Sequence, residues 1–455
     1  MIGKSSIKQA VGVEPMISAP MAEVIQLWSQ MYEGKAPWLN ATVKSLNLAA
    51  AIAAEIASMI TIEMKVAIDG SVRGKYLQEQ FDKIVLDKLR VFAVEYGVAK
   101  GGLVFKPYIE NGKLAVDFIQ ADQFFPVRFD SNGDLLAVVF VDQEKIGDKY
   151  YTRLEFHDYS DTQYVVRNSV YQSNSRDTLG SPASFGSVSR WAELEPEAII
   201  TGVERPLFSY FRFPLANTID PSSPLGVSGY SRATELIRQA DEQWSNLLWE
   251  FESGKRAIYV DVLAFKKDGD GNPTLPHKRL YRTLNASGNA NDEDLFHEWS
   301  PEFREASILS GLDAILKKVE YNCGLAYGTL SDPNVQAKTA TEIKISRQRT
   351  YVTVAGSQKA LQTALEELIY AMDAWATLGS LTPRGTYSVV FQWDDSVVVD
   401  KDAQFQQDMR LVTQGLMSKV EFRMRNMGED ETTAKKKIAE VQTEQPEEDS
   451  LFKGA

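Results

Sequence analysis

The sequence predicts an α+β fold, because strand-like and helix-like patterns occupy different stretches of the chain. Between residues 103 and 171, apolar and polar residues alternate and Asn-Gly pairs separate the runs, which is typical of antiparallel strands. After residue 228, apolar residues recur at helical spacing over long segments. A chain of 455 residues is long enough for about three domains with buried cores.

Composition narrows the classes of function. Hydrophobic residues make up 44% of the chain and charged residues 24%, the balance of a folded protein rather than a disordered one. A single cysteine, Cys323, excludes an internal disulfide and a cysteine-based zinc site. A net charge of −13 argues, at first, against a protein that binds DNA tightly.

The sequence shows no export or membrane segment. The first fifteen residues lack the apolar run of a signal peptide. The most apolar stretch, residues 46–62, carries Glu55 at its centre and is shorter than a membrane span. It is interpreted as a core helix, and the protein is expected to be intracellular in origin and not to span a membrane.

The first half of the chain is predicted to begin with helices and to continue as an antiparallel meander. The predicted helices cover residues 20–35, 40–60 and 76–96, with a strand over 62–68. The predicted strands cover residues 103–109, 114–119, 135–141, 150–157 and 163–171, and Asn111-Gly112 joins the first two. Residues 172–190, rich in Ser and Gly, are interpreted as a loop.

Two amphipathic helices dominate the middle of the chain. Residues 205–228 look irregular, and Ser228 or Ser231 is expected to cap a helix that runs to about Ser253 and ends at Gly254. A strand over 254–265 and a polar excursion over 266–298 precede a second helix from Arg304 to about Tyr327. The two helices are expected to form an antiparallel pair with a small insertion at one end.

The last part begins with a non-helical segment, LSDPNVQAKTATEI, which ends in a capping box formed by Thr339 and Glu342. A long helix to about Leu378, a strand over 387–393 and a helical tail after Asp400 follow. The final stretch, EVQTEQPEEDSLFKGA, is expected to be acidic and mobile.

Motifs for catalysis are missing, which favours a protein that is not an enzyme. Gly3-Lys4-Ser5 lacks the upstream glycine and strand of a phosphate loop, and His297-Glu298 lacks the second histidine of a zinc protease. The DGDGN run at 268–272 fits a turn better than a calcium loop. Asp394 and Asp395 beside Asp400 and Asp402 fit loop solvation and helix capping better than a magnesium site. No cofactor or metal is expected.

One basic stretch departs from the acidic average. Residues 335–360 carry five basic side chains against Glu342 alone. This is either a solvated basic helix face, which is the commoner case, or a loop and helix N-terminus that face phosphate groups.

Three strings in this order resemble the portal protein of tailed bacteriophages, in particular the siphophage type found in phages of Gram-positive bacteria. They are NTIDPSSPLGVSGYSRATELI at 217–237, CGLAYGTLSDPNVQAKTATEIK at 323–344 and DKDAQFQQDMRLVTQGLMSKVEFR at 400–423. The resemblance implies a portal fold with a mainly helical stem and crown, an antiparallel β-rich wing and a small α/β clip.

The resemblance also implies a division of the chain. It places the N-terminal part of the wing at 1–228, the stem helices at 229–253 and 304–328, the clip at 254–303 and the tunnel loop at 329–341. The long helix with the rest of the wing follows at 342–400, and the crown with the acidic tail at 401–455.

As a portal, the protein is expected to form a ring, usually a dodecamer, at one capsid vertex of the virion, after synthesis in the host cytoplasm. Double-stranded DNA would pass through it without sequence readout. The expected partners are the terminase large subunit, then the head-completion adaptor, and the major capsid and scaffolding proteins, but no membrane. Another ring-forming connector or tail protein is the first alternative, and a DNA-processing enzyme is the second.

The resemblance assigns site residues to the tunnel loop and to the clip. The DNA-channel residues would be Asn334, Gln336, Lys338, Thr339 and Lys344. The partner-docking residues of the clip would be Lys266, Lys267, Asp268, Asp270, Lys278 and Arg279. The first stem helix carries two arginines against five acidic residues, and an acidic lining would keep DNA contact weak. Lys338, repeated around a ring, would form one ring of positive charge.

Overall fold

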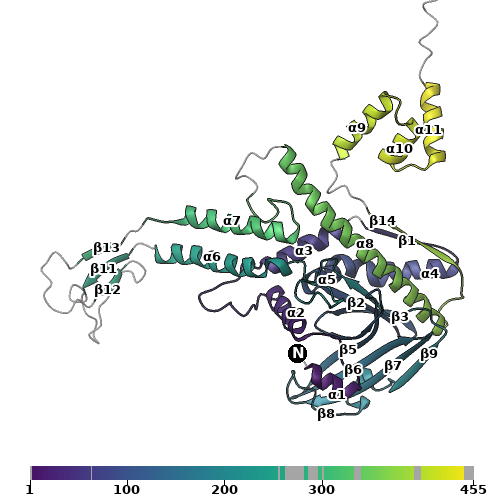
Figure 1. The fold of residues 1–455 in the computed structure, drawn as a ribbon, viewed down its shortest axis with the longest axis horizontal. Helices are drawn as coiled ribbons and strands as arrows, with labels where there is room; N and C mark the ends of the chain where they lie inside the picture. The colour runs from purple at the N-terminus through teal and green to yellow at the C-terminus, as the bar shows by residue number, and fades with distance from the viewer. Residues whose placement is uncertain are drawn as a thin grey trace, which may run out of the picture. The chain divides into compact units, whose positions relative to one another are not determined.

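The computed structural model describes residues 3–62, 64–254, 257–261, 281–284, 296–299, 302–332, 340–393 and 401–444. It confirms the predicted α+β fold (Figure 1). The chain divides into two compact units, Met1–Gln392 and Trp393–Ala455. Among the described residues, no helix is both long and apolar enough to span a membrane.

The first unit begins with three helices: α1 (Lys4–Val11), α2 (Ala19–Tyr32) and α3 (Leu48–Thr61). The prediction of a helix from residue 40 was wrong at its start. The side-chain oxygen of Asn40 accepts hydrogen bonds from the backbone N–H groups of Thr42 (2.8 Å) and Val43 (3.0 Å), and this local turn competes with a helix. The buried face of α3, which includes Ile52, confirms its interpretation as a core helix.

A continuous helical segment follows the short strand β1 (Lys65–Gly70). It consists of α4 (Val72–Gln80), the π-helical turns η1 (Phe81–Leu86) and η2 (Leu89–Ala93), and α5 (Val94–Lys100). The predicted helix over 76–96 is confirmed but is longer at both ends. Its predicted apolar face is buried, since Leu77, Phe81 and Leu89 are at most 1% exposed.

The predicted hairpin is confirmed by β2 (Gly102–Glu110) and β3 (Lys113–Gln120), which pair around Asn111 and Gly112. Both turn residues have positive φ, 50° and 70°, as a two-residue hairpin turn requires. A third strand, β10 (Ser209–Arg212), pairs with β2 from within the segment expected to be irregular. That expectation was wrong because β10 gains its hydrogen bonds from a strand a hundred residues away, which a local pattern does not reveal.

The second sheet contains the rest of the predicted meander. Its strands are β4 (Phe124–Phe129), β5 (Leu135–Ile146), β6 (Lys149–Ser160), β7 (Gln163–Ser173), β8 (Ser181–Pro182) and β9 (Glu197–Thr201). The order is β4-β5-β6-β7-β8, and β9 also pairs with β7. The interpretation of 172–190 as a loop was incomplete, since the segment contains β8 and buries Val188 against Val170. The turns η3 (Phe185–Ser187) and η4 (Ser189–Trp191) bring Trp191 into the same cluster.

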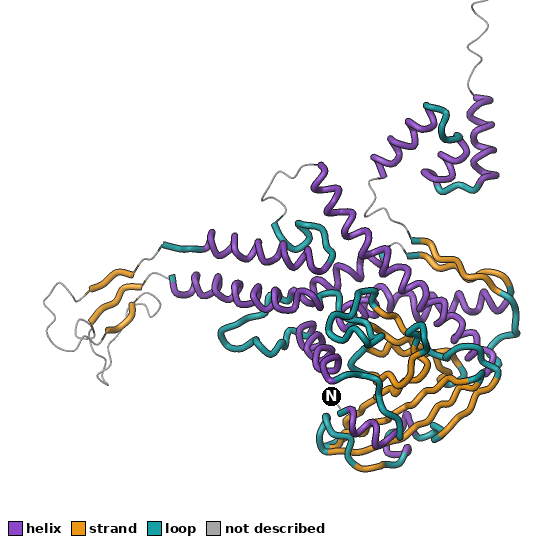
Figure 2. The backbone as a smooth tube through the Cα atoms, viewed as in Figure 1, coloured by secondary structure: helices purple, strands orange, loops and turns teal. Residues whose placement is uncertain are grey.

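The long helix α8 (Ala340–Leu378) holds the first unit together. Its C-terminal half is buried through Leu361, Leu365, Leu368 and Met372, and it packs on β2, β10 and α3. Figure 2 shows the backbone of this long helix in purple and the strands of the first unit in orange. The chain then forms β14 (Tyr387–Gln392), which pairs antiparallel with β1 over its full length. The predicted long helix and the strand after it are therefore confirmed.

The predicted antiparallel helix pair is formed by α6 (Thr234–Ser253) and α7 (Glu305–Cys323). The proposed capping of α6 by Ser228 or Ser231 was wrong. The chain enters α6 through a short turn, η5 (Ser231–Ala233), so that Ala233 occupies the N-cap position of α6. Within the described part of the chain, the buried Ser231 hydroxyl has no hydrogen-bond partner. Gly254 does end α6, and its N–H bonds the carbonyl of Glu250 (2.9 Å).

Between these helices lie the short strands β11 (Ala257–Asp261), β12 (Tyr281–Leu284) and β13 (Phe296–Trp299). They form one sheet, in which β11 pairs parallel with β12 and antiparallel with β13. The predicted strand after residue 254 is confirmed.

The second unit consists of α9 (Lys401–Thr413), α10 (Lys419–Met427) and α11 (Glu431–Glu444), which confirms a helical tail. Ser418 caps α10 by accepting the N–H of Glu421 (3.0 Å). Glu429 bonds Arg423 on α10 and Lys437 on α11, and so joins the two helices.

Candidate functional site

The α6–α7 hairpin is fixed at one end by an ion pair. Arg304, just before α7, donates from Nη2 to Oε2 of Glu250 near the end of α6 (2.8 Å). Its backbone N–H also bonds Oε1 of the same carboxylate (2.8 Å), which satisfies a donor at the start of α7. Glu250 therefore connects both helices at the point where the small sheet is inserted.

A loop of the first unit holds the other end of α6. The buried carboxylate of Asp241 accepts the indole N–H of Trp38 (2.9 Å) and the backbone N–H of Leu46 (2.6 Å). Burial raises the pKa of Asp241 above its ordinary value, although these hydrogen bonds act in the opposite direction. The loop over residues 33–47 is thus attached to the helix pair.

Most of the acidic residues expected on the surface of the first helix are already engaged. Asp241 and Glu250 are 2% and 6% exposed, and Glu235 and Glu242 both pair with Arg238 (2.6 and 2.8 Å). Glu252 is exposed. The net negative charge that α6 presents is therefore weaker than its sequence implies.

The chain leaves α7 through a tightly bonded turn over residues 324–332. Gly324 ends the helix with φ 71°, and the N–H of Leu325 bonds the carbonyl of Glu320 (2.9 Å). A Cβ at Gly324 would lie 2.3 Å from Oγ1 of Thr353 on α8, so the turn and α8 are in close contact. We call residues 320–332 the loop base, since the predicted tunnel loop follows directly.

Glu320 organises the loop base although it is 0% exposed. Its Oε1 accepts the backbone N–H groups of Gly328 (3.1 Å), Leu330 (2.6 Å) and Ser331 (2.8 Å). Its Oε2 accepts the hydroxyl of Ser331 (2.9 Å). Four donors around one buried carboxylate form a closed set of hydrogen bonds.

Two further contacts attach the loop base to its neighbours. The guanidinium of Arg349 on α8 lies over the rings of Tyr321 and Tyr327, 4.3 and 5.6 Å from their centroids. The backbone N–H of Asp332 bonds Oδ1 of Asp313 on α7 (3.0 Å). The turn is therefore held by α7 on one side and α8 on the other.

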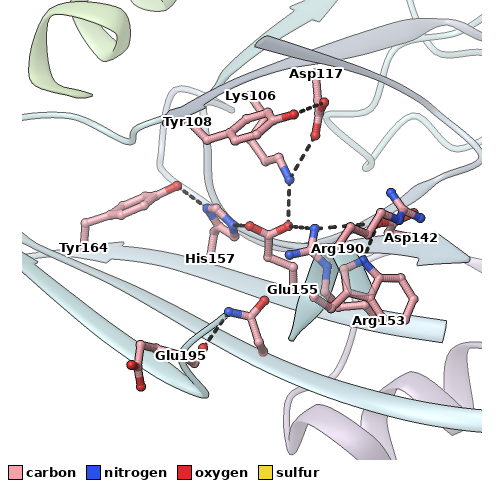
Figure 3. Close-up of polar contacts among 12 residues, drawn as sticks. Lys106, Tyr108, Asp117, Asp142, Arg153, Glu155, His157, Tyr164, Arg190 and Glu195 are labelled. Carbon is pink, nitrogen blue, oxygen red and sulfur yellow. Dashed lines mark hydrogen bonds and ion pairs between the residues drawn. The ribbon is translucent and has the colours of Figure 1, made fainter. Parts of the chain in front are cut away.

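A second polar centre lies buried between the two sheets. Lys106 of β2 donates to Oε2 of Glu155 on β6 (2.6 Å), and the other oxygen of Glu155 contacts Nε2 of His157 (2.9 Å), as Figure 3 shows. Nδ1 of His157 contacts the hydroxyl of Tyr164 on β7. Burial opposes ionisation of Glu155, but Lys106 and His157 outweigh it and hold its pKa well below its ordinary value.

His157 is packed inside the protein. It is 3% exposed and has T-shaped contacts with the rings of Phe140 and Tyr164. Burial lowers its pKa, although Glu155 acts in the opposite direction. Arg153 also bonds Glu155 (2.9 Å), so the network joins β2, β6 and β7 as a structural tie rather than as an open site.

A surface pocket of about 550 Å³ lies between α8 and the segments around residues 130–136 and 204–214. Glu367 of α8 lines it, and burial together with the nearby Asp134 raises the pKa of Glu367 to about 7. Arg205 also lines the pocket and stacks on Tyr370. No group of three metal-ligating side chains occurs in the part of the chain that the structure describes.

The site residues assigned from the sequence lie mostly outside the described residues. This holds for Asn334, Gln336, Lys338 and Thr339 and for the clip residues Lys266, Lys267, Asp268, Asp270, Lys278 and Arg279. Asp394, Asp395 and Asp400, interpreted as loop and capping residues, also lie outside the described residues. Lys344 lies in α8, but its side chain is not among those described. Their assignments remain predictions.

Sequence reasoning missed the loop base itself. Glu320 follows the apolar residue Val319 on a face that also buries Leu312 and Cys323. A carboxylate on a buried helix face, one turn before a Gly-rich break, was the available signal.

A helical hairpin with a small inserted sheet, a β-rich body and a long helix that comes after the loop base in the sequence fit a connector subunit of the phage portal class. The family model for phage portal proteins of the SPP1 Gp6-like type matches residues 45–450, and the chain belongs to that family. It is a phage portal, or head–tail connector, protein and a structural component of the virion. None of the curated proteins compared with the chain matches it.

Proposed function

We propose that the chain assembles as a closed ring, most often a dodecamer, at one capsid vertex, and that double-stranded DNA passes through the ring during packaging and ejection. The observation that carries this proposal is the exposed apolar surface of the α6–α7 hairpin. Trp249 is 63% exposed, and Phe251, Phe303 and Leu309 are each 47% exposed. Large apolar side chains gathered on a helix pair favour contact with another copy, and heterologous contacts close into a ring by rotation.

DNA can move through the channel only if the channel wall binds its phosphate groups weakly. Each neutralised phosphate adds salt-dependent affinity, so a strongly basic wall would retain the duplex. On α6 one arginine, Arg238, faces five acidic residues, four of which are paired or buried, so this helix offers DNA little unpaired charge. Lys338 in the predicted tunnel loop would then supply one ring of positive charge that contacts phosphates without reading sequence.

The inserted sheet between α6 and α7 is proposed as the docking tip. It would bind the terminase large subunit during packaging and the head-completion adaptor afterwards, through the clip residues named above. The major capsid and scaffolding proteins would contact other parts of the ring. We further propose that the protein has no enzymatic activity of its own, in keeping with the structural role of its family.

Mass photometry of the purified full-length chain tests the ring. We expect a species near twelve times the 50.9 kDa subunit mass. Trp249→Asp should shift the distribution to smaller species, whereas Val72→Asp, on an exposed position of α4, should not. A wild-type protein that stays monomeric at every protein and salt concentration would overturn the proposal, and metal-dependent nuclease activity would support a DNA-processing enzyme instead.

A further inference from the structure

The loop base contains an acidic side chain, Glu320, that lies in the interior of the protein instead of at its surface. Glu320 is fully buried, and no lysine or arginine among the described residues forms an ion pair with it. A buried carboxylate without compensation is strongly unfavourable. Here the compensation comes from the turn, which directs three backbone N–H groups and one hydroxyl at the carboxylate.

This arrangement couples a helix to a turn. The N–H groups of Gly328, Leu330 and Ser331 converge on one oxygen, so the turn is seated only when all three meet the end of the Glu320 side chain. The side chain itself is fixed because its helix packs against α6. Any displacement of the turn would therefore expose the carboxylate or leave buried donors unpaired.

The opposite side of the turn is held differently. The guanidinium of Arg349 on α8 stacks on the rings of Tyr321 and Tyr327. Stacking tolerates sliding of the rings more readily than a converging set of hydrogen bonds does. Glu320 therefore fixes the position of the turn, and Arg349 keeps it against α8.

We propose that Glu320 is a positioning residue for DNA passage: by seating residues 328–331 against α7, it sets the point from which the chain continues into the predicted tunnel loop. This inference rests on the proposed channel function. It predicts that loosening the seat impairs DNA transport in rings that assemble normally.

The test compares three variants of the full-length chain, Glu320→Ala, Glu320→Gln and Ser331→Ala, with Glu366→Ala as the control. Glu366 is an exposed carboxylate of α8 away from the loop base. Glutamine keeps an oxygen where Oε1 accepts three N–H groups and places an amide opposite the Ser331 hydroxyl, so it should rescue the geometry. Alanine removes every acceptor.

The first readout is amide hydrogen exchange in assembled rings. Residues 328–331 should exchange at least about tenfold faster in Glu320→Ala, while Glu320→Gln should stay within about threefold of wild type. Ser331→Ala, which removes only the hydroxyl, should lie between them. Glu366→Ala should match wild type.

The second readout is the number of DNA-filled heads made by phage that carry each variant, with ring formation measured in parallel by mass photometry. We expect Glu320→Ala rings of normal mass but at least about tenfold fewer filled heads, with most of the loss restored by glutamine. Normal filling despite faster exchange at 328–331 would overturn the positioning role. If Glu320→Ala does not fold, reduced filling by Ser331→Ala would support the proposal, and normal filling would refute it. If wild-type rings pass no DNA, the channel function itself fails.

Discussion

Arg304 and Glu250 close the α6–α7 hairpin where the small sheet is inserted, with Nη2 2.8 Å from Oε2 and the Arg304 backbone N–H 2.8 Å from Oε1. The same carboxylate thus pairs with a side chain and accepts from the first turn of α7. These contacts with Arg304 lower the pKa of Glu250 below its ordinary value of 4.5. A carboxylate with a lowered pKa in the folded state contributes stability above its unfolded pKa.

Replacing Glu250 by alanine should lower the melting temperature at neutral pH. Because the pKa is lowered in the folded protein, the contribution is fully present above about pH 4.5 and is lost as the pH falls through the folded value. Thermal denaturation from pH 7 to pH 3 should show the difference between Glu250→Ala and wild type shrinking. Glu252→Ala, the exposed neighbour, is the control, and an equal effect there would show that charge on α6 rather than the pair is responsible.

Replacing Glu367 by glutamine should stabilise the protein, but only above the normal pKa of a glutamate. Burial and Asp134 raise the pKa of Glu367 from 4.5 to about 7, so keeping it charged opposes folding at pH 8 and has no effect at pH 4. The gain at pH 8 should be about 1–3 kcal/mol. Urea unfolding of Glu367→Gln and Glu366→Gln at both pH values measures it. A gain that is equal at pH 4 and pH 8 would contradict the titration.

The buried ion pair between Lys106 and Glu155 should lose more stability when one partner is replaced than when both are replaced. Lys106→Met leaves Glu155 without its closest cation and should destabilise the protein by about 3–5 kcal/mol. The double variant Lys106→Met/Glu155→Leu removes the charge that was left and should recover much of the loss. Denaturant unfolding of both singles and the double variant gives the coupling energy. Additive losses would show that the two residues act independently.

Gly324 should be one of the least replaceable glycines. It has φ 71°, and a Cβ there would lie 2.3 Å from the Thr353 side chain, so Gly324→Ala should cost about 1–3 kcal/mol. Adding Thr353→Ala should relieve the clash but not the backbone strain. Gly356→Ala, in open space on α8, should instead stabilise the helix by about 0.5–1 kcal/mol. Equal effects at the two glycines in thermal unfolding would refute the assignment.

The sequence predicted best where local chemistry decides the structure. The hairpin at Asn111-Gly112 needs two residues that tolerate positive φ, and the long helices need only their apolar spacing. The predictions failed where residues far away in the sequence determine the local structure. β10 exists because β2 is beside it, and Trp191 is buried because β7 presents Val170. At Asn40, two local hydrogen bonds to its side chain stabilise a turn, and they prevent the helix that the apolar spacing predicted from this residue.

In the candidate site, too, local features could be predicted from the sequence and contacts with distant groups could not. A break after the second helix was predicted, but about four residues too late, since the helix was expected to run to about Tyr327 and α7 ends at Cys323. The role of Glu320 was not predicted, because its partners are backbone groups, which no side-chain pattern reports. Most of the residues assigned to the tunnel loop and the clip lie outside the described chain, so their roles still rest on the family resemblance.

The pairing of β1 with β14 has a consequence for how the protein is made. Lys65 lies opposite Gln392, so one edge of the body is closed by residues more than three hundred positions apart. Contacts between residues so far apart in the sequence form late in folding, because closing a long intervening segment costs conformational entropy before the contacts stabilise the chain. During translation β1 must wait for nearly the whole chain to leave the ribosome. A polypeptide that terminates before residue 387 would lack β14 and keep β1 unpaired, and an unpaired strand edge is a surface prone to aggregation.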